Sequence, residues 1–179
     1  MRGCVDKMDD LEQVIVFKLG EQNYAVNIMA VKEIIRMQKI TKIPAAPDFI
    51  EGIISLRGSI IPIIDMSKRF GLSYDYVMDD GMSENSNKRI IVLQIDGTVF
   101  GVIVDEVQEV LSIPKNAIEK PPEVVSGFSY GVQINSAYLK GIAKVDDRLI
   151  ILINYNRILF EHEIEELSGA SLNGQTAAV

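Results

Sequence analysis

The chain has 179 residues, of which 47% are hydrophobic and 24% are charged. That length suits one domain, or two small ones with a shared core, and the composition excludes bulk disorder, collagen-like structure and coiled coils. The formal net charge of −7 argues against nucleic acid as the main partner. Because Trp is absent, we predict an aliphatic core.

The single cysteine and the single histidine, Cys4 and His162, lie at opposite ends of the sequence. We therefore expect no intrachain disulfide, no Cys/His metal site and no cofactor. Residues 1–13 are polar and acidic, unlike a signal peptide, and no segment approaches the roughly 18 apolar residues of a membrane-spanning helix. The sequence predicts a cytoplasmic protein without direct membrane insertion, and a flexible N-terminal tail over residues 1–13.

Two β-hairpins are predicted from alternating strand and turn signals. The first pairs residues 14–19 with 24–28, and the second pairs 90–95 with 98–104. Asp96-Gly97 separates the strands of the second hairpin, and this dipeptide favours a two-residue turn in which both residues have positive φ.

The two hairpins belong to an internal duplication. Residues 24–35 match residues 100–111 at an offset of 76, and residues 52–65 match 141–154 at an offset of 89. Within the first match, 31–35 and 107–111 carry apolar residues at helical spacing, which predicts two short helical segments. Each repeat thus indicates a small strand-rich barrel.

The duplication suggests boundaries for the whole chain. We expect a first barrel half over residues 14–72, a flexible connector over 73–88 and a second half over 89–154. An amphipathic C-terminal helix is expected over 155–168 and a disordered tail over 169–179. Residues 60–64 and 149–153 are almost wholly apolar, so both faces of these strands are predicted to be covered, although a buried sandwich strand would give the same pattern.

Catalytic signatures are missing from the sequence. It contains no phosphate-binding loop, no nucleophile elbow and no His-Glu-x-x-His, and Asp96-Gly97-Thr98 lacks the residue order of an aspartic protease. Asp65 and Asn154 occupy equivalent positions after the strongest strands, where we predict that each caps a following helix or turn rather than acting as one of a pair of catalysts. We therefore predict that the protein is not an enzyme.

Arg57 interrupts the duplication. It lies in a tight turn, Leu56-Arg57-Gly58, whose repeat counterpart carries Asp146-Asp147. An arginine on such a turn offers five donors in fixed geometry. An internal carbonyl and a partner's carboxylate suit these donors equally well.

These segments together resemble the CheW family of chemotaxis coupling adaptors. The resemblance rests on Gly52-Ile-Ile-Ser-Leu-Arg-Gly-Ser-Ile-Ile-Pro-Ile-Ile-Asp65, preceded by Tyr24-Ala-Val-Asn-Ile and Val31-Lys-Glu-Ile, and it covers residues 11–167. It implies a mostly β fold of two pseudo-repeated five-stranded, SH3-like barrels on a shared apolar core. The pattern leaves open whether the two halves exchange strands. The family usually has Asn-Leu-Arg-Gly where this chain has Ser55-Leu56-Arg57-Gly58.

The resemblance also implies a function. It describes a scaffold that couples the cytoplasmic signalling tip of chemoreceptors to the histidine kinase CheA, at membrane-associated receptor arrays. The family's receptor-binding positions fall on Val31, Glu33, Gly52 and Arg57, with Val107 and Val110 as further candidates. No motif identifies a kinase-binding surface.

Simpler explanations exist for part of this set. Val31 and Glu33 also fit ordinary barrel packing and a solvated charge. The alternatives to an adaptor are a small-molecule-binding β-barrel, or a CheW-like module of another two-component scaffold.

Overall fold

The computed structural model describes residues 10–70, 86–120 and 138–158. The connector expected over 73–88 lies almost wholly outside these residues, and the tail over 169–179 lies outside them. Of the C-terminal helix expected over 155–168, the structure describes residues 155–158, of which 155–157 form a 3-10 turn. Of the N-terminal tail expected over 1–13, residues 11–13 instead begin the first strand. No helix within the described ranges is long and apolar enough to cross a membrane.

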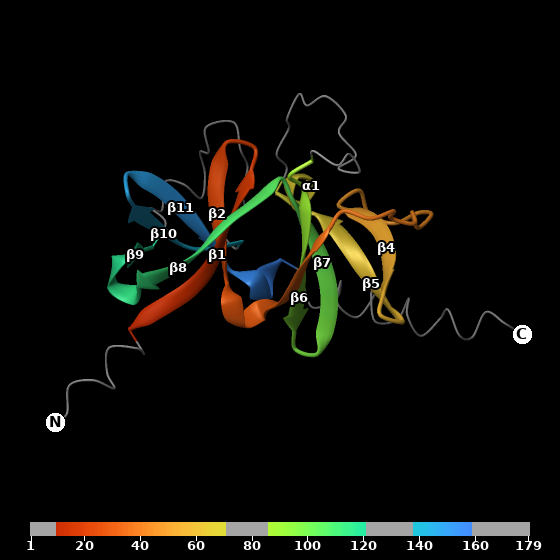
Figure 1. The fold of residues 1–179 in the computed structure, drawn as a ribbon, viewed down its shortest axis with the longest axis horizontal. Coiled ribbons are helices and arrows are strands. Elements are labelled where there is room, and N and C mark those ends of the chain that lie inside the picture. Colours follow the sequence, from red (N-terminus) through yellow and green to blue (C-terminus); the bar gives the residue numbers. More distant parts are fainter. Residues whose placement is uncertain (1–9, 71–85, 121–137, 159–179) are drawn as a thin grey trace, which may run out of the picture.

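Two β-sheets make up most of the described chain (Figure 1). Sheet A has the order β8-β1-β2-β11-β10-β9, and sheet B has the order β3-β6-β7-β5-β4. The strands of sheet A are β1 (Leu11–Leu19), β2 (Gln22–Asn27), β8 (Glu106–Pro114), β9 (Ile118–Glu119), β10 (Leu139–Val145) and β11 (Arg148–Ile153). Those of sheet B are β3 (Val31–Arg36), β4 (Ile50–Leu56), β5 (Ser59–Asp65), β6 (Arg89–Ile95) and β7 (Thr98–Val104).

Both sheets curl because their edge strands follow one another in the chain. In sheet A, the 3-10 turn η2 (Lys115–Ala117) alone separates edge strand β8 from edge strand β9. In sheet B, the segment after β3 returns to β4, where Thr41 and Ile53 exchange two backbone hydrogen bonds of 2.9 Å. The predicted fold class is confirmed, with β9 as a sixth strand in sheet A and with both hydrogen-bond ladders left open.

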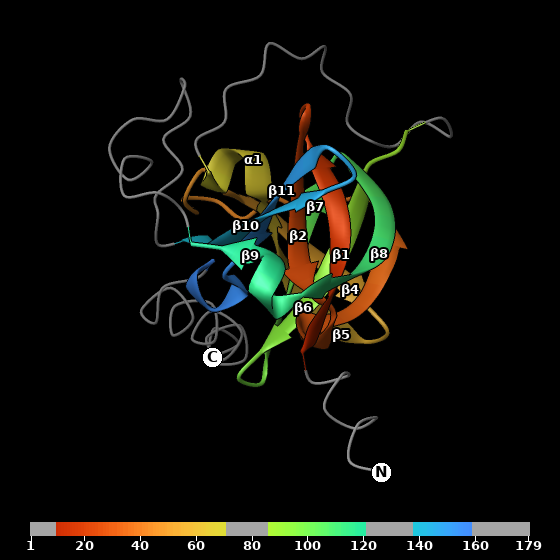
Figure 2. The same cartoon turned by 90° about the vertical axis from the view of Figure 1, so that its left-hand side faces the viewer.

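The sheets exchange strands between the sequence halves (Figures 1 and 2). β3 follows β2 in the chain but pairs with β6 of sheet B, and β8 follows β7 but pairs with β1 of sheet A. The ranges 14–72 and 89–154 therefore describe the sequence repeat, while each sheet draws strands from both ranges. The exchange preserves the repeat, because β11 lies parallel to β2 just as β5 lies parallel to β7.

The prediction of two short helical segments is wrong. Residues 31–35 lie in β3 and residues 107–111 lie in β8, and side-chain burial alternates along β3 from Val31 to Arg36. Apolar residues at 31, 34 and 35 fit helical spacing, but valine and isoleucine branch at Cβ and favour extended backbone. Pairing with a strand from the other half of the sequence, which local spacing does not report, decides the outcome.

Three apolar clusters fill the molecule. The central cluster joins the two sheets, with Phe17 and Tyr24 of sheet A and Leu93 and Phe100 of sheet B among its members. The other two clusters lie inside the curl of each sheet. Along β1, alternate residues enter the central cluster and the interior of sheet A, so this strand is buried on both faces as its apolar sequence predicts.

Turns and caps follow the local sequence, with one exception. Asp96 and Gly97 have φ of 49° and 81°, which confirms the predicted hairpin turn. Asp65 caps the one-turn helix α1 (Met66–Arg69), because its Oδ1 accepts a hydrogen bond of 3.2 Å from the backbone N–H of Lys68. Asn154 precedes the 3-10 turn η5 (Tyr155–Arg157) without a side-chain cap hydrogen bond, so the predicted cap is wrong there.

Candidate functional site

The structure joins two of the predicted site residues in an ion pair. The guanidinium Nη2 of Arg57 lies 2.8 Å from Oε2 of Glu33. Arg57 belongs to the turn between β4 and β5, and Glu33 lies on β3, so the pair connects the two edges of sheet B. This contact fastens the open side of the curled sheet.

Backbone geometry places Arg57 at the outermost point of its hairpin. Arg57 and Gly58 have φ of 50° and 81°, the positive values of a two-residue turn whose twist matches that of the flanking strands. The side chain of Arg57 is 76% exposed, whereas that of Glu33 is only 18% exposed. A partly buried carboxylate therefore positions an exposed guanidinium, most of whose donors face solvent.

The ion pair bears on the first of the two interpretations of Arg57, a contact with a group inside the protein. The internal group that it meets among the described residues is the carboxylate of Glu33, not a backbone carbonyl. Since a guanidinium has five donors, the contact leaves room for a second carboxylate from outside the chain. The structure does not show such a partner, and that reading stays a prediction.

Gly52 is buried, and the backbone of Thr41 approaches it so closely that only glycine fits at this position. Its φ is +150°, and a Cβ built there would lie 2.1 Å from the carbonyl oxygen of Thr41. It pairs with Ile63 at a register shift in β4, next to the Thr41–Ile53 hydrogen bonds. Gly52 thus allows the segment that follows β3 to approach β4 closely enough for Thr41 to pair with Ile53.

Val31 and Val107, which are repeat counterparts, lie at the join between the sheets. Both are half-buried and pack against the central cluster, Val31 at the start of β3 and Val107 near the start of β8. Val110 lies further along β8 in sheet A, where it is exposed and opposite Ile15 of β1. The six predicted residues therefore divide between the sheets, and only Glu33 and Arg57 form a direct ion pair.

Sheet A contains a second ion pair that the sequence reasoning missed. Arg148 Nη2, at the start of β11, lies 2.5 Å from Oε1 of Glu109 on β8. Glu109 is the repeat counterpart of Glu33, so the offset of 76 pointed to this carboxylate. Its arginine follows the turn residues Asp146 and Asp147 instead of occupying the turn.

Exposed apolar side chains accompany both ion pairs. Ile34 and its counterpart Val110 are exposed on the edge strands; each directly follows its glutamate, Glu33 or Glu109, and therefore points to the opposite face of the strand. Ile60 is 64% exposed and its counterpart Leu149 is 57% exposed, each near the beginning of its strand. The prediction that both faces of 60–64 and 149–153 are covered is therefore wrong at these first positions.

Two further titratable groups near the end of β5 have shifted pKa values. The carboxyl of Asp65 has its pKa raised by burial and by the charge of Glu51, although the Lys68 N–H opposes this shift. The side-chain hydrogen bond from Lys68 to Glu51 raises the pKa of Lys68 despite partial burial. Within residues 10–70, 86–120 and 138–158, no group of three or more His, Cys, Asp and Glu could hold a metal ion.

Comparison with known proteins gives a consistent result. A family model described as the CheW-like domain matches residues 13–163. The chemotaxis protein CheW of Klebsiella aerogenes is 33% identical over 153 residues, which cover 86% of this chain and 84% of that protein. The chemotaxis protein CheW of Treponema pallidum is 30% identical over 160 residues, covering 89% of both chains.

A solved structure agrees with the sequence relatives. The crystal structure of the scaffolding protein TtCheW from Thermoanaerobacter tengcongensis matches with a TM-score of 0.70 and 41% sequence identity. The match covers 84% of this chain and 88% of that one. The resemblance seen in residues 11–167 is thereby confirmed, and the chain belongs to the CheW family of chemotaxis proteins.

Proposed function

We propose that this protein is a non-enzymatic adaptor that couples the cytoplasmic signalling tip of chemoreceptors to the histidine kinase CheA. The observation that carries the proposal is the Glu33–Arg57 pair, which presents an exposed guanidinium on a sheet that also exposes Ile34 and Ile60, in a chain of the CheW family. In this role the protein works in the cytoplasm and is recruited to membrane-associated receptor arrays.

The chemistry of sheet B suits a helical partner. An amphipathic helix offers an apolar stripe bordered by charged residues, and apolar anchors in a groove supply most of such binding energy. Ile34 and Ile60 are available to cover the stripe, and Arg57 can pair with a carboxylate at its border. Val31 supports β3 from the join between the sheets.

The six residues have different parts in this proposal. Arg57 contacts the receptor directly, and Glu33 positions it. Gly52 has an indirect part: it keeps β4 in place, because the segment containing Thr41 occupies the space where a side chain would lie. Val107 and Val110 both lie on β8 of sheet A, Val107 at the join between the sheets and Val110 further along the strand.

A small-molecule-binding barrel is supported less well. The interiors of both sheets are occupied by packed aliphatic side chains, with Val14, Val16 and Ile113 in one and Ile61, Ile63 and Ile90 in the other. Side chains packed in this way among the described residues disfavour a ligand inside the curl of either sheet. A CheW-like module of another two-component scaffold would use the same surface and gives the same expectation for Arg57.

Reconstitution tests the proposal. CheA, a soluble chemoreceptor signalling fragment and the purified protein are mixed, and phosphate incorporation into CheA is measured with each component omitted in turn. We expect the protein to bind both partners and to raise phosphorylation only when all three are present. A protein that binds neither partner and leaves phosphorylation unchanged would contradict the adaptor role.

A further inference from the structure

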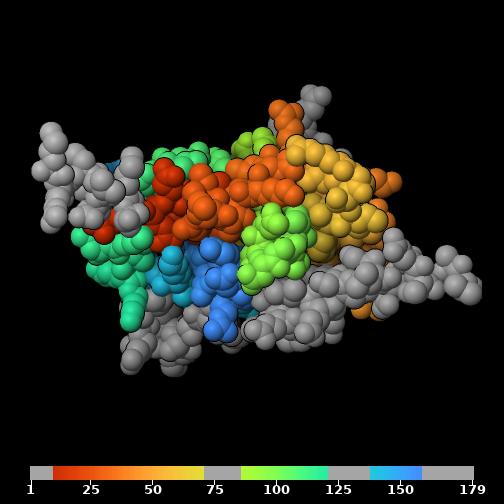
Figure 3. Space-filling model, turned by 90° about the horizontal axis from the view of Figure 1, so that it is seen from below, coloured from red at the N-terminus to blue at the C-terminus, as the bar shows by residue number. Residues whose placement is uncertain are grey.

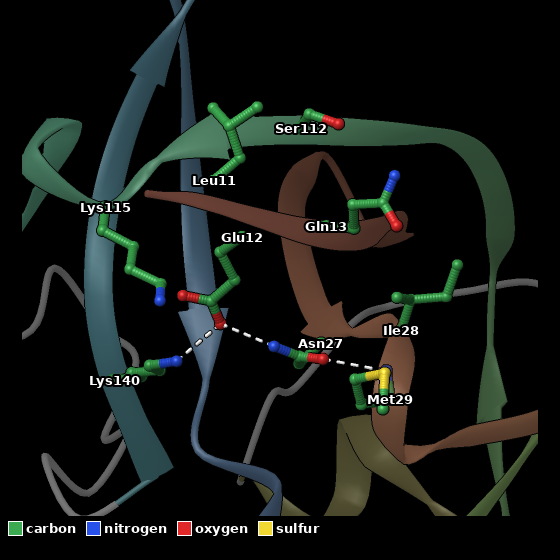
Figure 4. Close-up of a pocket in the computed structure, with 9 residues that line it drawn as sticks. All are labelled: Leu11, Glu12, Gln13, Asn27, Ile28, Met29, Ser112, Lys115 and Lys140. Atoms are coloured by element: carbon green, nitrogen blue, oxygen red, sulfur yellow. Dashed lines mark hydrogen bonds and ion pairs between the residues drawn. The ribbon is translucent and has the colours of Figure 1, made fainter. Parts of the chain in front are cut away.

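A cavity of about 610 Å³ lies on sheet A, away from the Glu33–Arg57 pair (Figure 4). Its walls come from the start of β1, the end of β8, η2, β10 and the 3-10 turn η1 (Ile28–Ala30). A cavity of this size is large enough for one or two side chains of a partner. The lining residues are Leu11, Glu12, Gln13, Asn27, Ile28, Met29, Ser112, Lys115 and Lys140.

A buried carboxylate organises the cavity. Oε1 of Glu12 accepts a hydrogen bond of 3.1 Å from the side-chain amide of Asn27 and one of 2.5 Å from Nζ of Lys140. Asn27 in turn accepts a hydrogen bond of 2.8 Å from the backbone N–H of Met29. Glu12, which is the buried charged residue of the described chain, thereby connects β1, β10 and η1.

The carboxyl of Glu12 remains ionised in this setting. Burial by itself would raise its pKa, but the hydrogen bonds from Lys140 and Asn27 and the positive charges of Lys140 and Lys115 hold the pKa below its ordinary value. The lining therefore contains one negative and two positive groups. A net positive cavity in a chain of net charge −7 favours an anionic group from outside.

Lys115 is the lysine available to such a group. Its backbone N–H donates a hydrogen bond of 2.8 Å to the carbonyl of Asp10, which fixes the position of the residue. Its ammonium has no hydrogen bond or ion pair within the described part of the chain. Figure 4 shows the side chains of Lys115 and Lys140 both pointing toward Glu12 at the floor of the cavity.

Apolar side chains border the same cavity. Met29 is 86% exposed at the tip of η1, Leu11 is exposed at the start of β1, and Ile28 is half-buried between them and the core. Exposed apolar side chains of this size mark contact surfaces when they are grouped beside polar anchors. The combination suits a ligand that carries a carboxylate next to an apolar group.

We propose that this cavity binds an acidic side chain and an adjacent apolar side chain of a protein partner, with Lys115 pairing to the carboxylate and Met29 and Leu11 covering the apolar group. The choice of partner, the chemoreceptor signalling tip, rests on the proposed adaptor function. Continuity also supports it, because η1 leads directly into Val31 of β3. In Figure 3 the orange segment lies between the red start of the described chain and the yellow strands of sheet B on one face.

Nuclear magnetic resonance of the full chain tests the site without any receptor. The probe is the blocked dipeptide acetyl-Leu-Glu-amide, with acetyl-Leu-Gln-amide and acetyl-Gly-Glu-amide as controls. We expect saturable shifts at the amides of Gln13, Met29 and Lys115 with the first probe, and at least fivefold weaker binding of both controls. Lys115→Gln should reduce binding of the first probe about fivefold, the effect of losing one exposed charge pair.

A matched variant separates local charge from general charge. Lys144→Gln makes the same change on β10, the strand of Lys140, but outside the cavity lining, so it should leave binding unchanged. Equal shifts with the Leu-Glu and Leu-Gln probes, no shifts at the lining residues, or equal effects of the two variants would each overturn the proposal.

The receptor fragment then distinguishes the two proposals. If the wild-type protein binds the fragment and Lys115→Gln weakens that binding about fivefold, the cavity is part of the receptor contact. If the wild-type protein binds no fragment, the adaptor proposal fails, while the dipeptide result still decides the cavity. Unchanged fragment binding by Lys115→Gln would overturn the cavity's assignment to this partner.

Discussion

The two sheets carry equivalent ion pairs with different exposure. In sheet B the arginine occupies the turn itself, with 76% of its side chain exposed, above a glutamate that is 18% exposed. In sheet A the arginine has moved to the first position of β11 and is 35% exposed, its glutamate is 41% exposed, and two aspartates occupy the turn. Duplication thus preserved the contact between edge strand and hairpin while the turn residues diverged.

This difference separates a structural role from a binding role. Both pairs fasten an edge strand to the facing hairpin, so fastening alone does not require an arginine in the turn. Only sheet B holds its arginine outward over a partly buried carboxylate, at the cost of a positive φ for a residue with a side chain. We therefore propose that the Glu33–Arg57 pair takes part in partner recognition, whereas the Glu109–Arg148 pair mainly stabilises its own sheet.

The largest expected loss of stability comes from replacing Gly52 or Gly141, because a neighbouring segment passes very close to each of these glycines. Gly52→Ala places a Cβ 2.1 Å from a backbone oxygen at a φ of +150°, whereas at Gly141 the nearest atom, at 2.5 Å, is a methyl group of Ile118. We expect Gly52→Ala to lower the free energy of unfolding by about 3 kcal/mol, and Gly141→Ala by about half as much. Urea unfolding measures both, and a smaller loss for Gly52→Ala than for Gly141→Ala would contradict this account of sheet B.

A smaller effect is expected from the ion pairs themselves. Double-mutant cycles with Glu33→Gln and Arg57→Gln, and with Glu109→Gln and Arg148→Gln, measure the coupling free energy of each pair. Exposed pairs contribute about 0.2–1 kcal/mol, so we expect both couplings in that range, with the sheet B pair stronger because Glu33 is less exposed. A coupling free energy above this range for the Glu109–Arg148 pair alone would contradict the roles proposed for the two pairs.

The smallest expected effect is on the pH dependence of stability, through the contacts of Glu12 with Lys140 and Asn27. Because its pKa is lower in the folded protein than the ordinary 4.5, its stabilising contribution is complete above pH 4.5 and is lost as pH falls through the folded pKa. We expect the free energy of unfolding of Glu12→Gln to fall less steeply than that of the wild type between pH 5 and pH 3. Parallel pH profiles for the two proteins would show that Glu12 is not linked to folding.

Local sequence predicted local structure well. The Asp96-Gly97 turn, the Asp65 cap and the repeats at offsets of 76 and 89 all depend on neighbouring residues, and the structure confirms them. The apolar clusters among the described residues also agree with the shared apolar core that the family resemblance implies. These features need no knowledge of distant partners.

Features that depend on distant contacts were not predicted. The segments 31–35 and 107–111 are strands because each pairs with a strand of the other sequence half. The Glu33–Arg57 and Glu109–Arg148 pairs each join an edge strand to a hairpin of the same sheet that lies distant in sequence, and the exposure of Ile60 and Leu149 depends on how each sheet is covered. For the site, residue types were therefore predictable, and the contacts between them were not.

One measurement tests the central claim most directly: the affinity of a chemoreceptor signalling fragment for Arg57→Gln and for Arg148→Gln, determined by isothermal titration calorimetry beside the wild type. Both variants lose one cation from equivalent ion pairs, so general charge effects cancel. We predict about tenfold weaker binding for Arg57→Gln and a change of less than about twofold for Arg148→Gln. Equal losses in the two variants, or a loss confined to Arg148→Gln, would contradict the account.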